Sequence, residues 1–198
     1  MKTLVVHPQD STTTFLRSLY DDLPNKTVIT GGITISQLQK HISTHHYSQV
    51  ILCGHCSPQG LLSVGQFPKS GLYIIDEMMT SSLRNKPNTF YLWCDSNVFV
   101  RRHGLTGFHT GMFLSQMSEC RYFEVDCTEQ DILESNSTFA ETVARHINEP
   151  PIVFYKNVLS EYGRLTQNPV ACYNHSRLFL NQYEPHLFLG KVVKTQCK

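Results

Sequence analysis

The sequence has no excess of charge of either sign. Its 17 Lys and Arg residues are balanced by 16 Asp and Glu residues, which gives a formal net charge of +1 over 198 residues. Because nucleic acids and anionic membranes attract concentrated positive charge, this balance argues against both as partners. Charged residues make up only 17% of the chain and hydrophobic residues 40%, a composition typical of a globular protein rather than of a disordered one.

The sequence also lacks a long hydrophobic run. No stretch approaches the roughly 20 apolar residues that span a bilayer, and the first residues show no signal-peptide pattern. The seven cysteines are odd in number and most lie in apolar, strand-like segments, which is typical of reduced thiols rather than of a disulfide framework. We therefore expect a cytoplasmic protein that makes no contact with membranes.

Internal repeats, low-complexity tracts and linkers are absent, and the length suits one domain over residues 1–198. Short apolar runs alternate with segments whose apolar residues recur at helical spacing. The expected strands lie at residues 3–7, 26–30, 49–54, 89–94 and 121–127. The expected helices lie at residues 11–23, 33–45, 75–84, 110–119 and 131–148. This alternation predicts an α/β fold, a three-layer α-β-α sandwich around a mostly parallel sheet.

Three segments have more specific expectations. Asp10 and Ser11 are residue types that cap helices, so we expect them to begin the first helix. Residues 58–71 contain three glycines and two prolines, which predicts an irregular arm or a small hairpin above the sheet edge. In the last fifty residues only a sixth strand at residues 152–155 is suggested.

Two of the expected buried strands end in reactive side chains. His55 follows the strand at residues 49–54, and Cys94 closes the strand at residues 89–94. The carboxyl ends of parallel strands are where such sheets bind ligands, and neighbouring strands would bring the imidazole and the thiol together. An imidazole that takes the thiol proton creates a nucleophilic thiolate. The structural alternative is that Cys94 is a small core residue and His55 a turn residue.

The apolar strand that ends in His55 (VILCGH, residues 50–55) precedes a second one that ends in Cys94 (FYLWC, residues 90–94). This order resembles the caspase-like cysteine peptidases, which include caspases, gingipain- and clostripain-type enzymes, separase and the CHAT domains. Their shared pattern is an apolar strand ending in His-Gly and a later apolar strand ending in the catalytic cysteine. The resemblance covers about residues 1–150 and leaves residues 151–198 as an unassigned C-terminal extension.

The resemblance implies a caspase/CHAT-like fold and a cysteine endopeptidase that needs no cofactor and no metal and acts on a peptide or protein. Cys94 would attack the scissile carbonyl, His55 would transfer the proton, and the backbone N–H groups of Cys56 and Cys94 would hold the oxyanion. Apart from the resemblance, the position of Asp95 next to Cys94 suggests that it tunes the site or contacts a basic side chain of the substrate, and its residue type is equally typical of the turn that follows a strand. One departure is Cys56, where the family usually has glycine. The alternative is therefore a catalytically degenerate member that binds a peptide or protein.

Three readings of other motifs are less well supported. Cys53 and Cys56 form the C-x-x-C pattern of disulfide oxidoreductases, but the glycines that follow argue against the long helix that this motif opens. The same pair could begin a zinc site, yet no second close-spaced pair completes it; the remaining candidates are Cys120, Cys127 and His103. A nucleotide-binding domain would need a glycine-rich or P-loop motif, which the chain lacks.

Overall fold

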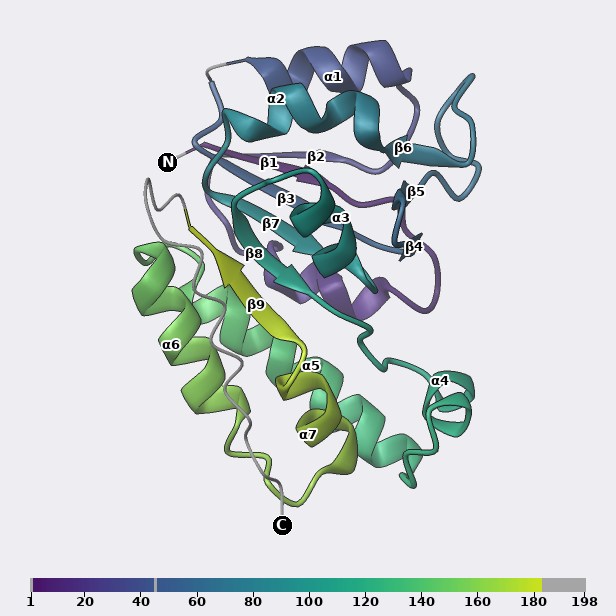
Figure 1. The fold of residues 1–198 in the computed structure, drawn as a ribbon, viewed down its shortest axis with the longest axis vertical. Helices are drawn as coiled ribbons and strands as arrows, with labels where there is room; N and C mark the ends of the chain where they lie inside the picture. The colour runs from purple at the N-terminus through teal and green to yellow at the C-terminus, as the bar shows by residue number, and fades with distance from the viewer. Residues whose placement is uncertain (1, 45, 183–198) are drawn as a thin grey trace.

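The computed structural model describes residues 2–44 and 46–182 (Figure 1). Within them a six-stranded central sheet has the order β2-β1-β3-β7-β8-β9, in which β9 is antiparallel to β8 and all other neighbours are parallel. The α/β fold with a mostly parallel sheet is therefore confirmed. In sheet order, the strands are β2 (Lys26–Ile29), β1 (Thr3–Val6), β3 (Gln49–Cys53), β7 (Thr89–Leu92), β8 (Gly107–Thr110) and β9 (Leu178–Asn181).

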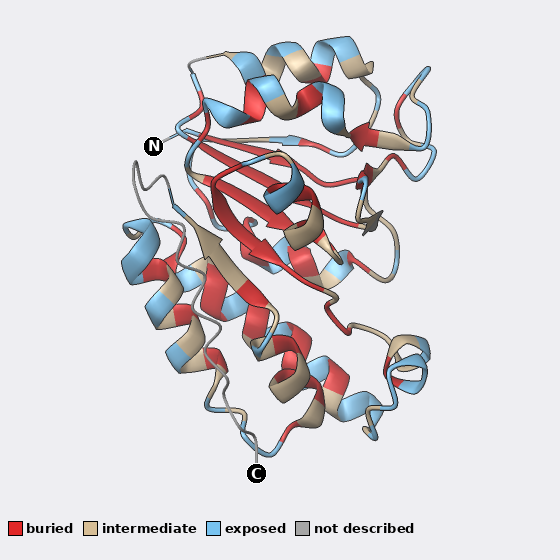
Figure 2. Ribbon diagram, in the orientation of Figure 1, coloured by how far each residue is buried: buried red, intermediate tan, exposed pale blue. Residues whose placement is uncertain are grey.

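Helices cover both faces of this sheet, which is compatible with the expected three layers (Figure 2). The strands β1, β3 and β7 are buried along their whole length, as their apolar runs predict, and β8 is buried along its whole length as well. Alternate residues of each strand point to opposite faces. In β3, for example, Ile51 packs into one core cluster, and Val50 and Leu52 pack into the other.

One face is covered by helices that follow β1 and β8. These are the 3-10 helix η1 (Thr14–Leu19), α5 (Glu129–His146), α6 (Pro151–Tyr162) and α7 (Pro169–His175). The other face carries α1 (Ile35–Ser43), the 3-10 helix η2 (Glu77–Met79), α2 (Thr80–Arg84) and α3 (Ser96–Arg102). No helix among the described residues is long and apolar enough to cross a membrane.

The arm at residues 58–71 belongs to a small antiparallel sheet, so the expectation of a hairpin there is confirmed. Its strands are β4 (Cys56–Ser57), β5 (Gly60–Leu62) and β6 (Tyr73–Ile75). At Gly60 φ is +156°, and a Cβ there would collide with the carbonyl of Ile75. Only glycine therefore allows β5 and β6 to approach as closely as they do.

The expected strand at residues 121–127 is wrong, and so is the first part of the helix expected at residues 110–119. A short helix, α4 (Met117–Tyr122), occupies this region, and a capping box between Gln116 and Glu119 begins it. The aromatic residues that suggested a strand are partly or largely exposed there, with Tyr122 at 81%. These aromatic residues lie outside the central sheet, in which β8 is the strand next to β7.

Strand β8 escaped sequence analysis because its composition is unusual. Gly107 begins it with φ +129°, and a Cβ at this position would collide with the carbonyl of Thr89 on β7. His109 adds a polar residue, although its side chain is fully buried. A glycine and a histidine within four residues make the strand hard to recognise in the sequence. The strand forms nevertheless because its tertiary packing outweighs its low β-propensity.

The expected strand at residues 152–155 is also wrong, because this segment begins α6. Pro150 is the N-cap residue, and Pro151 occupies the first helical turn, where proline is well tolerated. The last strand of the described chain is β9, which lies in the C-terminal segment for which the sequence predicted no element. The first expected helix is shortened to η1, whose N-cap residue is Thr13 rather than Asp10 or Ser11.

Candidate functional site

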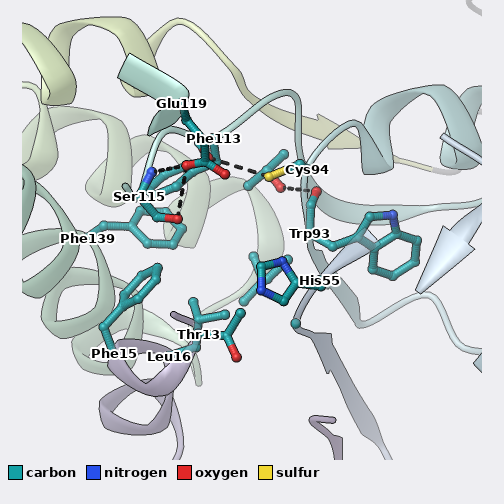
Figure 3. Close-up of a pocket in the computed structure, with 13 residues that line it drawn as sticks. Thr13, Phe15, Leu16, His55, Trp93, Cys94, Phe113, Ser115, Glu119 and Phe139 are labelled. Atoms are coloured by element: carbon teal, nitrogen blue, oxygen red, sulfur yellow. Dashed lines mark hydrogen bonds between the residues drawn. The ribbon is translucent and has the colours of Figure 1, made fainter. Parts of the chain in front are cut away.

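The candidate site lies at the carboxyl ends of the central strands, where the chain changes direction across the sheet. From β1 the sheet continues to β2 on one side and to β3 on the other. In such sheets the loops at this switch point separate and leave a crevice that binds ligands. The segment after β1 and the residues after β3 and β7 line one pocket there, which has an empty volume of about 420 Å³, part of it open to solvent (Figure 3).

The two residues of the predicted dyad lie at the same pocket. β3 and β7 are parallel neighbours in which Cys53 is paired with Leu92. His55 and Cys94 each lie two residues beyond this pair, so both emerge at the same edge of the sheet. Both line the pocket, and Figure 3 shows one ring nitrogen of His55 on the side of Cys94.

The other ring nitrogen of His55 is held by the loop after β1. Its Nε2 atom lies 2.7 Å from Oδ2 of Asp10 and 2.6 Å from Oγ1 of Thr12. The Thr12 hydroxyl lies 2.7 Å from Oδ1 of Asp10 and donates to it, so it accepts from the imidazole. A carboxylate and a hydroxyl that both accept place the proton of a neutral His55 on Nε2.

The charge of Asp10 supports this assignment. Partial burial raises the pKa of this carboxyl, but hydrogen bonds from Thr12, the nearby His55 imidazole and the backbone N–H of Thr13 outweigh that effect. The pKa of Asp10 is therefore held below its usual range, and the carboxylate is ionised at neutral pH. Its oxygens can only accept, which leaves Nδ1 of a neutral His55 as the basic nitrogen.

The loop that carries Asp10 is itself anchored at several points. The backbone N–H groups of Thr12 and Thr13 lie 2.8 and 3.1 Å from Oδ1 of Asp10 and donate to it, which forms a tight turn. Gln66, in the arm at residues 58–71, accepts from the backbone N–H of Gln9 at 3.1 Å and donates to the Gln9 carbonyl at 2.5 Å. These bonds fix the carboxylate before any substrate binds.

Cys94 is half-buried at the end of β7. Its Sγ atom donates a hydrogen bond to the carbonyl of Phe113 at 3.5 Å. The next residue, Asp95, has φ +59° and ψ +21°, a left-handed conformation that is uncommon outside glycine. Strain of this kind concentrates at functional sites, where it fixes the direction of a side chain at a sharp turn. Here the turn lies between Cys94 and α3.

The remaining predicted site residues flank this pair. Cys56 begins β4 directly after His55, so its backbone N–H follows the histidine as the oxyanion prediction requires. Asp95 is the N-cap residue of α3, makes no side-chain capping bond and does not line the pocket. The oxyanion roles of Cys56 and Cys94 and the substrate contact of Asp95 stay predictions.

The competing chemistries fit the geometry less well. Cys53 is fully buried and forms no disulfide, and burial raises the pKa of its thiol far above the usual range. A strand rather than a helix follows it, so nothing activates this thiol as in disulfide oxidoreductases. Among the described residues, no group of three or more His, Cys, Asp or Glu side chains is placed to hold a metal ion.

Asp10 and Thr12 are the functional residues that sequence analysis missed. The sequence predicts that Asp10 caps a helix, because aspartate before an apolar stretch is typical of a helix N-cap. Its contact with His55 joins residues 45 positions apart, and no local pattern carries that information. The available signal was topological, since the loops after the first and third strands of such a sheet flank the switch point.

Comparison with known proteins identifies no relative of this chain among the families and curated proteins searched. Neither a scan against protein-family models nor a search of curated proteins finds a match to this chain. A functional conclusion therefore rests on the chemistry of the pocket and on the resemblance carried by the strands that end in His55 and Cys94.

Proposed function

We propose that this protein is a cysteine endopeptidase of the caspase/CHAT-like type, with Cys94 as the nucleophile and His55 as the base. The observation that carries the proposal is that these two side chains line one pocket at the carboxyl ends of adjacent parallel strands. Asp10 and Thr12 support it further, because they leave Nδ1 of His55 available to accept a proton.

The reaction would begin with transfer of the Cys94 thiol proton to Nδ1 of His55. The thiolate attacks the scissile carbonyl carbon, and the carbonyl oxygen becomes an oxyanion that backbone N–H groups stabilise. As the intermediate collapses, the C–N bond breaks and His55 returns the proton to the leaving amine. Water then attacks the acyl-enzyme, with His55 again as the base, and releases the new carboxyl group together with the Cys94 thiol.

Asp10 acts here as a positioning residue. Its carboxylate fixes the tautomer and the orientation of the imidazole and stabilises the imidazolium that forms after proton transfer. Asp95 would contact a substrate residue outside the pocket.

The test is chemical labelling of the folded protein with a peptidyl electrophile that alkylates thiols, followed by mass spectrometry of each cysteine. We expect Cys94 to react faster than every other cysteine, and His55→Ala to slow this reaction about 100-fold or more, as loss of a general base does. His41→Ala, on α1 and away from the pocket, is the matched control. Equal labelling of Cys94 in the presence and absence of His55 would contradict the proposal.

A second candidate is a degenerate caspase-like domain that binds a peptide or protein at the same edge. Two observations favour it: Cys56 replaces the glycine usual in the family, and the Cys94 thiol donates to the Phe113 carbonyl, which stabilises its neutral form. This candidate predicts that peptides bind with no cleavage and that Cys94→Ala leaves their affinity unchanged.

A further inference from the structure

The pocket beside Cys94 has apolar walls. They are formed by side chains from η1, β7, α5 and the segment after β8: Phe15, Leu16, Leu92, Phe113 and Phe139. All of them except Phe15 belong to the core cluster on one face of the sheet, and Phe15 and Cys94 pack against this cluster. The thiol therefore lies at the mouth of a hollow in the apolar core rather than on a polar surface.

The charges around the hollow disfavour an acidic ligand. Apart from Cys94, the only titratable side chains that line it within residues 2–44 and 46–182 are His55 and Glu119, and no Lys or Arg of that part of the chain does. A carboxylate bound there would lose its water without gaining a cationic partner, which is costly in an apolar site. The nearby Asp10 carboxylate adds repulsion.

Glu119 is committed to a structural role rather than to a basic ligand. Its Oε2 atom accepts hydrogen bonds from the backbone N–H and the hydroxyl of Ser115, at 2.7 and 3.2 Å, and from the backbone N–H of Gln116 at 3.1 Å. These bonds hold the turn that begins α4. A lysine or arginine side chain that reached this carboxylate would lose its water among aromatic rings.

The aromatic rings give the hollow its shape. The rings of Phe15 and Phe113 are stacked with centroids 6.4 Å apart, and those of Phe113 and Phe139 are 4.6 Å apart at an interplanar angle of 47°. In Figure 3 these three rings lie across the pocket from His55. Because the leaving amine must face His55 to receive its proton, the acyl part of a substrate is directed toward the rings.

We infer that this hollow binds the side chain on the amino side of the scissile bond, called P1, and that P1 is a large apolar residue such as Leu, Met or Phe. This inference rests on the proposed peptidase function and adds the class of substrate. An apolar P1 side chain that enters the hollow would bury its surface against the five apolar side chains of the walls. The backbone carbonyl of the P1 residue would then lie beside the Cys94 sulfur.

The experiment uses peptidyl acyloxymethyl ketones that differ only at P1, with Leu, Phe, Ala, Asp or Lys at that position. The second-order rate constant for labelling of Cys94 is measured for each. We expect the Leu and Phe reagents to react about 10- to 200-fold faster than the Ala reagent, the range that a hydrophobic pocket provides. The Asp and Lys reagents should be slower than the Ala reagent.

A variant of the wall tests whether the hollow causes this preference. Phe15 is only partly buried, so Phe15→Ala removes one wall at a modest cost to folding. It should reduce the ratio of Leu to Ala labelling several-fold. Phe123→Ala is the matched control, because this phenylalanine is partly exposed and lies outside the pocket. It should leave the ratio as in the original protein.

The outcomes separate this inference from the function on which it rests. If Cys94 reacts in a His55-dependent way but prefers Lys, Asp or no particular P1, the apolar P1 assignment is overturned and the peptidase stands. A Lys preference that Glu119→Gln removes would reassign the pocket to basic residues. If iodoacetamide, which has no P1 group, also labels Cys94 no faster than the other cysteines and independently of His55, both conclusions fall.

Discussion

In the proposed reaction, the position of one proton on the His55 ring decides whether the imidazole can act as the base for Cys94. The Asp10 carboxylate can only accept, so it draws the imidazole proton to Nε2 and leaves Nδ1 basic. An amide in place of the carboxylate would present a donor to Nε2 and favour the opposite tautomer. The proton would then occupy Nδ1, and the ring would no longer accept one from the thiol.

Asp10→Asn is therefore expected to slow labelling of Cys94 about 100-fold, at the lower end of what a placed general base contributes. Asparagine keeps the Oδ1 acceptor for the backbone N–H groups of Thr12 and Thr13, so the loop should stay in place. The measurement is the rate of labelling against pH together with the melting temperature. The rate should be lower across the pH range while the melting temperature barely changes. Asp22→Asn, at an exposed carboxylate, is the control, and an unaltered rate in Asp10→Asn would refute the tautomer argument.

The contact between α5 and α6 is stabilised by a charged cluster at one end. His146 lies 2.9 Å from Glu149 through Nδ1 and 2.9 Å from Glu161 through Nε2. Both nitrogens can donate only when the ring is protonated. Burial lowers the pKa of His146, but the hydrogen bonds to the two carboxylates outweigh it and raise the pKa above its usual value.

The α5–α6 contact should consequently weaken as pH rises. The raised pKa means that the stabilisation is complete below the unfolded value of about 6.5 and is lost as pH rises through the higher folded value. Thermal melts from pH 6 to 9 should show this decline in the original protein. His146→Gln should be less stable at pH 6 and show a shallower decline above it, whereas His41→Gln should keep the original profile. A decline equally steep in His146→Gln would show that the cluster does not link the helices.

Sequence analysis found the elements whose local signal agrees with their environment. β3 and β7 are continuous apolar runs, and both are buried on both faces. It failed where tertiary contacts override composition. β8 tolerates glycine and histidine because of its position between β7 and β9. α6 tolerates the β-branched Ile152 and Val153 because their low helix propensity costs less than about 1 kcal/mol per residue. The dyad candidates were found from strand ends, whereas Asp10 needed the strand order.

The strand order as a whole brings together residues that are far apart in the chain. Asp10, His55 and Cys94 follow β1, β3 and β7, which are successive neighbours in the sheet.

The sheet and the residues next to it also bury two histidine side chains. His7, directly after β1, and His109, in β8, are both fully buried. His7 hydrogen-bonds the Tyr20 hydroxyl at 2.9 Å, and His109 contacts the Gly107 carbonyl at 3.1 Å.

These two histidines predict that the whole fold loses stability in mild acid. Burial lowers the pKa of His7 to about 4, against an attraction from Asp10, and burial lowers the pKa of His109 to about 4 as well. In the unfolded chain both would titrate near 6.5, so between about pH 6.5 and pH 4 the unfolded state binds more protons and is favoured as pH falls. Each shift corresponds to about 3 kcal/mol at full effect.

Urea unfolding between pH 7 and pH 4 should show this loss, and NMR titration of the histidine Cε1 protons should assign it. The His7 and His109 resonances are expected to stay in the neutral position down to about pH 5, because protonation would place a charge inside the core. For His109 this charge would have a nitrogen without a partner, since Nε2 makes no hydrogen bond within the described part of the chain. If either ring titrates near pH 6.5 while the protein remains folded, that histidine is solvated and cannot contribute to acid unfolding.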